Sequence, residues 1–64
     1  MIGLERLNKA HELRRMAARY RYLATGIDDE ATIAILNAMS REGDAQAERI
    51  EREVLLQKNR DHAA

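Results

Sequence analysis

No residue of this chain can cross-link a small core. A chain of 64 residues normally needs a disulfide, a bound metal or a partner chain to be firmly stable. Cys is absent, and the two histidines, His11 and His62, are 51 positions apart. The fold open to such a chain is therefore a packing of helices, with a core that other chains complete.

Two glycines divide the chain into helical segments. Pro is absent, so Gly26 and Gly43 are the strongest breaks in the interior. Ala, Leu, Arg and Glu are good helix formers and dominate the segments between the breaks, and strand patterns are missing. We predict a single all-α domain of two to three helices, at about residues 3–24, 29–42 and 45–60, in a helical hairpin or small bundle. Residues 61–64 are predicted to be a frayed tail.

Capping residues stand at each predicted boundary. Gly26 follows the first segment, where a helix C-terminus favours a left-handed residue. Asp28 or Asp29 is predicted to cap the second helix. Gly43 is predicted to end that helix, with Asp44 capping the third.

Apolar residues at helical spacing define the predicted core. The second segment is apolar around most of its circumference, so we expect it to be the most buried element. Burial of so few large side chains roughly offsets the cost of ordering the chain, so a lone monomer is marginal. We predict self-association as a homodimer or larger, or docking on a larger protein partner. The predicted core or interface residues are Leu13, Met16, Tyr20, Leu23, Ile33, Leu36, Met39, Ile50 and Val54.

Charge is zero overall but unevenly distributed. Residues 1–27 carry a balance of +4, and residues 28–53 carry −5. We predict that the basic first helix lies against the acidic later segments, within or between chains. The alternative is that four arginines form a face for nucleic acid or for an acidic protein. These are Arg14, Arg15, Arg19 and Arg21, and pairing with carboxylates would separate the two hypotheses.

Patterns that support catalysis or metal binding are missing from the sequence. Ser40 is the only serine and lies inside a predicted helix, and no Gly-rich loop is present. Asp28, Asp29 and Glu30 are consecutive, so their carboxylates would point in different directions. His11 lacks the second histidine four residues later that a zinc helix needs. We therefore expect no catalytic residue, no cofactor and no metal.

The N-terminal segment contains charge at Glu5 and Arg6 and no long apolar run. It predicts neither a signal peptide nor a membrane span, and we expect a cytoplasmic protein of a bacterium or phage. The sequence favours a small, non-enzymatic protein–protein interaction module, such as a regulator, adaptor, inhibitor or assembly component. A small nucleic-acid-binding regulator that uses the Arg-rich first helix is the alternative.

Overall fold

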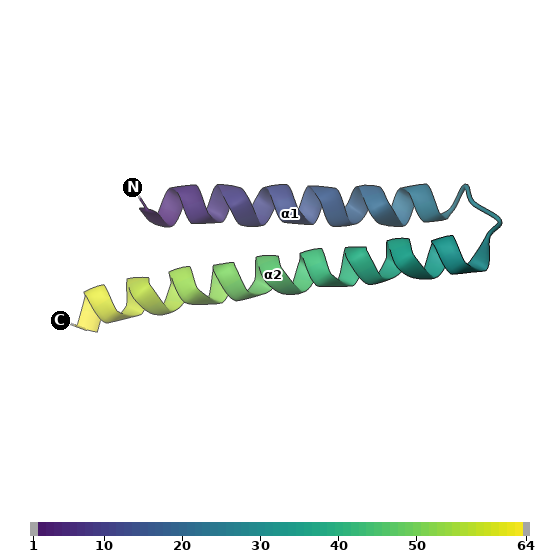
Figure 1. The fold of residues 1–64 in the computed structure, drawn as a ribbon. Helices are drawn as coiled ribbons and strands as arrows, with labels where there is room; N and C mark the ends of the chain where they lie inside the picture. The colour runs from purple at the N-terminus through teal and green to yellow at the C-terminus, as the bar shows by residue number, and fades with distance from the viewer. Residues whose placement is uncertain (1, 64) are drawn as a thin grey trace.

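Two antiparallel helices and their short connection make up residues 2–63. The structure is a computed structural model that describes the backbone of residues 2–63 and the side chains of residues 3–60. Helix α1 spans Ile2–Ala24 and helix α2 spans Glu30–Ala63. They pack along each other as an elongated hairpin whose Cα atoms extend over 54 × 15 × 11 Å (Figure 1). The predicted all-α hairpin is confirmed, and no strand occurs between residues 2 and 63.

The predicted break at Gly43 and Asp44 is wrong. Helix α2 passes through both residues and continues to Ala63, past the start of the predicted frayed tail; Ala64 lies outside the described residues. Gly43 faces α1 closely, because a Cβ built on it would lie 3.4 Å from the Cβ of Ala17. Close packing at this point outweighs the cost of about 1 kcal/mol for a glycine inside a helix.

Helix α1 ends in a tightened turn. The backbone amides of Thr25 and Gly26 donate to the carbonyls of Tyr22 and Leu23, at 3.1 and 3.2 Å. These bonds satisfy carbonyls that the end of the helix would otherwise leave free. No glycine within residues 2–63 has a positive φ, so the left-handed conformation predicted at Gly26 is also wrong. The short-range bonds take the place of the glycine cap.

Asp29 caps α2, and it is one of the two residues that we predicted for this cap. Its carboxylate accepts hydrogen bonds from the backbone amide of Thr32 at 3.0 Å and from the Thr32 hydroxyl at 2.5 Å. The side-chain bond, followed by the backbone bond, lowers the pKa of Asp29 below its ordinary value of 3.8. The ionised carboxylate is therefore the form that stabilises the start of the helix.

We expect Asp29→Ala to lower the melting temperature, and Asp29→Asn, which keeps one acceptor oxygen, to lower it less. The pKa of Asp29 is depressed in the fold, so its charge stabilises the protein above pH 3.8. This contribution is lost as the pH falls through the lower, folded pKa. Thermal unfolding followed by circular dichroism should show the gap between the wild type and Asp29→Asn closing in acid. A gap that is constant from neutral to acid pH would contradict this role.

The core is a seam of small side chains. Each helix contributes small residues spaced seven apart, which keeps them on one side of the helix. Small side chains let the two backbones approach closely, which large ones would prevent. We call this set the small-residue seam: Ala10, Ala17, Ala24, Ser40 and Ala47, all of them buried.

The large apolar residues flank this seam instead of filling the core. Two antiparallel helices give each helix only one contact face, so a helix that is apolar nearly all round must leave much of its surface in water. The first half of α2 is therefore not the most buried element, and Ile35 is 60% exposed. Of the predicted core residues, Met16, Leu23 and Met39 are exposed, and six are half-buried: Leu13, Tyr20, Ile33, Leu36, Ile50 and Val54.

Candidate interaction surface

One broad side of the hairpin carries ion pairs between the helices. Arg21 donates to Asp44 at 2.8 Å and to the hydroxyl of Ser40 at 2.7 Å. Arg14 donates to Glu51 at 2.5 Å and lies 3.7 Å from Asp44. We call Arg14, Arg21, Asp44 and Glu51 the charged face. The prediction that the basic first helix lies against acidic residues of the later segments is confirmed.

Hydrogen bonding shifts the titration of the charged face. The bond between Arg14 and Glu51 lowers the pKa of Glu51 and raises the pKa of Arg14. Arg14 is exposed and Glu51 is half-buried, and ion pairs so open to water add little to stability. They bridge α1 and α2 along one side of the hairpin. Nearer the termini, Arg6 and Glu53 form another ion pair between α1 and α2.

Ser40 is the one buried polar side chain among the described residues, with 2% of its surface exposed. Its hydroxyl accepts the bond from Arg21, which reaches across from α1. A buried polar group needs such a partner to offset its lost hydration. The seam and the charged face are therefore coupled at this residue.

The four arginines of the predicted basic face do not act together. Arg14 and Arg21 are paired with carboxylates of α2. Arg15 and Arg19 are exposed and make no ion pair within residues 3–60. Helical spacing places Arg15 and Arg19 on the side of α1 that faces away from α2. The structure thus divides the predicted face into a matched half and a solvated half.

The other broad side of the hairpin is apolar around its middle, and toward the termini it carries the Arg6–Glu53 ion pair, because Arg6 is seven residues before Leu13 and Glu53 is fourteen residues after Met39. Consecutive residues of a helix emerge about 100° apart, so Leu13 and Arg14 lie on opposite sides of the small-residue seam. Leu13 borders a shallow hollow of about 180 Å³ that Met16 and Tyr20 also line. From α2, Met39 reaches the same hollow. We call five large side chains on this side the apolar face: Leu13, Met16, Tyr20, Leu23 and Met39.

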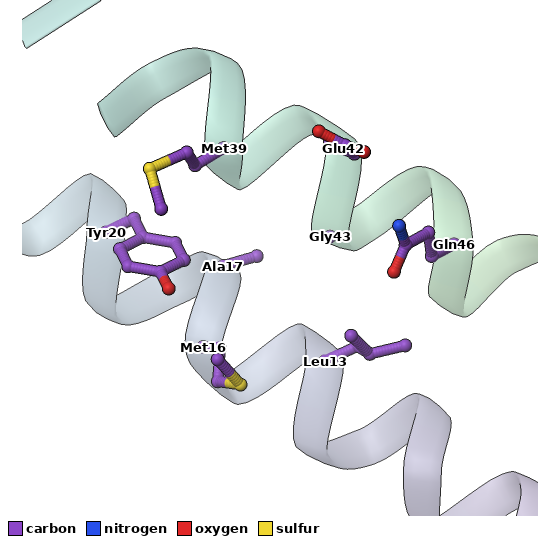
Figure 2. Close-up of a pocket in the computed structure, with 8 residues that line it drawn as sticks. All are labelled: Leu13, Met16, Ala17, Tyr20, Met39, Glu42, Gly43 and Gln46. Carbon is purple, nitrogen blue, oxygen red and sulfur yellow. The ribbon is translucent and has the colours of Figure 1, made fainter. Parts of the chain in front are cut away.

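Gly43 borders the hollow and adds no side chain to it. In Figure 2 the side chains of Tyr20 and Met39 lie toward one end and those of Leu13 and Gln46 toward the other, with bare Gly43 between them on α2. Glu42 adds a carboxylate at the border. The result is an apolar depression surrounded by side chains that stand above it, which is the shape that accepts a side chain from another helix.

A wider groove lies at the open end of the hairpin, where the two helices diverge in Figure 1. Its volume is about 1020 Å³. Leu7 and Val54 line it together with exposed Leu4 and Leu56. The apolar lining adds to the large apolar surface that the hairpin leaves uncovered.

No three His, Asp or Glu side chains of the described residues converge on a point that could hold a metal ion. Neither helix within residues 2–63 combines the length and the apolar character needed to cross a bilayer. Comparison of the chain with protein-family models, with curated proteins and with solved structures finds no match.

Sequence reasoning missed the small-residue seam. The signal was present in Ala10, Ala17 and Ala24, which repeat every seven residues, and again in Ser40 and Ala47. The predicted stripe on the first helix contained Ala17 and Ala24 as well as Leu13, Met16, Tyr20 and Leu23. We predicted its large residues as the contact, because large apolar residues usually fill a core. In the structure the two helices contact each other through the alanines at one side of that stripe.

Proposed function

We propose that this protein is a small, cytoplasmic, non-enzymatic interaction module that packs its helices against those of another protein chain. Roles of this kind are regulator, adaptor, inhibitor and assembly component. One observation carries the proposal: large apolar side chains are exposed around a core of small ones. Among the described residues the exposed set is Leu4, Met16, Tyr22, Leu23, Ile35, Met39, Leu55 and Leu56. Three of them, Met16, Leu23 and Met39, belong to the apolar face, and a contiguous apolar patch on a surface marks a protein interaction site.

The thin core supports the same proposal. Between residues 3 and 60 the buried side chains are four alanines and one serine. Burying a methyl group contributes only about 0.8 kcal/mol, far less than a full Leu or Ile. A partner that covers the flanking large residues would add the apolar burial that the hairpin lacks.

The pairing of the arginines favours a protein partner over nucleic acid. Asp44 and Glu51 already engage Arg14 and Arg21. A phosphate backbone would have to displace these carboxylates and approach their negative charge. Only Arg15 and Arg19 remain as solvated cations of the original four.

The melting temperature should rise with protein concentration, because an associated state binds only folded chains. Thermal unfolding by circular dichroism over a wide concentration range, with sedimentation on the same samples, measures this. The expected result is an assembly at high concentration and a lower melting temperature on dilution. A well-folded monomer of 7.3 kDa whose melting temperature does not depend on concentration would overturn the proposal.

A further inference from the structure

We infer that the occupant of the apolar face is a second copy of this chain, packed so that α1 lies antiparallel on α1 and α2 lies antiparallel on α2. The dimer is a four-helix bundle whose two loops lie at opposite ends. This inference rests on the proposed function, and it names the partner and its geometry.

The broad side of the hairpin is close in size to the interface of a stable dimer. Its Cα atoms extend over 54 × 15 Å, an outline of about 800 Å² that α2, with 34 residues, spans fully and α1, with 23 residues, spans in part. A standard interface buries about 800 Å² on each partner. One second hairpin of the same length covers the whole side, including the apolar face and its hollow.

The apolar face is complementary in shape to itself. A two-fold interface requires one patch that fits a copy of the same patch. The hollow over Gly43 is a depression, and Met16 and Met39 beside it are exposed side chains. Methionine is flexible and fills irregular gaps. Each copy therefore offers both the depression and, in Met16 near the dimer axis, a side chain that can enter the depression of the other copy.

Charged residues alternate in sign along the outer edges of the broad side that carries the apolar face. On α1, Glu12 and Arg19 are seven residues apart, and on α2, Glu42 and Arg49 are also seven apart. Seven-residue spacing places each couple on one edge of its helix, and all four residues are exposed. When two copies pack antiparallel, Glu12 meets Arg19 of the second copy and Glu42 meets Arg49 of the second copy. Each contact then forms twice in the dimer.

The Glu12–Arg19 contacts and the Glu42–Arg49 contacts specify the same two-fold axis of the dimer. The α1 couple is centred between residues 15 and 16, and the α2 couple between residues 45 and 46. Within the hairpin, Ala17 lies opposite Gly43, which places residues 15 and 16 opposite about residues 44 and 45. The two centres therefore agree to about one residue, or about 1.5 Å along the helix.

The same register pairs two exposed apolar residues. Ile35 and Leu56 are also centred between residues 45 and 46, and they continue the seven-residue row of Glu42 and Arg49. They are 60% and 54% exposed in the hairpin. In the antiparallel dimer Ile35 lies against Leu56 of the second copy. One symmetry axis thus explains the charges and the exposed apolar residues together.

Charge reversal tests this register. Glu42→Arg alone and Arg49→Glu alone each place like charges together twice per dimer, and each should weaken dimerisation by roughly tenfold or more. The double variant restores opposite charges across the axis and should recover most of the wild-type affinity. Residues 42 and 49 are two helical turns apart in one chain, so they do not pair within it. Sedimentation equilibrium measures the dissociation constants.

Single cysteines test the faces, and the absence of native Cys makes them specific. Gln46→Cys lies beside the proposed axis and should yield a covalent dimer with a short bis-maleimide. Ala18→Cys, exposed on the side of the charged face, is the matched control and should remain a monomer on denaturing gels.

The outcomes separate this inference from the proposed function. Recovery by the double variant and cross-linking through Gln46→Cys support the antiparallel dimer. An assembly that ignores the charge reversals, or that cross-links equally through Ala18→Cys, overturns the inference and leaves self-association standing. A concentration-independent monomer overturns both.

Discussion

Ala17→Leu should unfold the hairpin, whereas Ala18→Leu should leave it folded. Ala17 is fully buried in the small-residue seam, and its Cβ lies 3.4 Å from the position that a Cβ on Gly43 would occupy. Ala17 packs where the two backbones approach closely, so a leucine must push the helices apart or turn into the adjacent hollow, and the neighbouring seam residues lose contact. Overpacking a tight site typically costs about 1–3 kcal/mol. A hairpin with so small a core has little stability to spare.

Ala18 is the matched control, because it is exposed on the same helix. Ala and Leu have similar helix propensities, so neither substitution changes the intrinsic preference of α1 by much. Circular dichroism at 222 nm and thermal unfolding measure the result. A hairpin with Ala17→Leu that melts like the wild type would mean that the two helices are not held together along this seam.

Arg21→Glu should lower the stability by about 1–2 kcal/mol, because Arg21 joins the charged face to the seam. The substitution removes the donor to the buried hydroxyl of Ser40 and puts a carboxylate beside Asp44. Leaving a buried polar group without its partner costs about 1–3 kcal/mol, and exposure of Arg21 screens the repulsion. For a chain of this size, each kcal/mol shifts the melting temperature by about 4–8 °C.

Arg15→Glu is the control for this prediction, because it makes the same change in net charge on an exposed residue that has no ion pair in the described structure. Its melting temperature should stay near that of the wild type. The difference between the two variants should shrink in high salt, leaving the part due to Ser40. Equal losses in both variants would show that net charge matters and that the contacts of Arg21 do not.

Local signals in the sequence were sufficient for α1 and for the start of α2. The residues of α1 are strong helix formers, and Asp29 supplies a cap that works through its own neighbour, Thr32. The attraction between the two halves also followed from the sequence, because their net charges are opposite. Such features depend on a few adjacent residues or on summed charge, so they can be predicted directly from the sequence.

Two features depended on the tertiary structure. From the local sequence, Gly43 predicts a helix break, yet α2 continues through it because the glycine lets Ala17 approach. A glycine inside a helix costs about 1 kcal/mol, which is small compared with the packing along a whole helix. The choice of core was also not local. Ala17 and Leu13 lie on one stripe of α1, and only the small side chains opposite, Ser40 and Ala47, make the alanine edge the contact. How closely two helices approach is a property of both surfaces together, whereas the sequence of either helix describes only one.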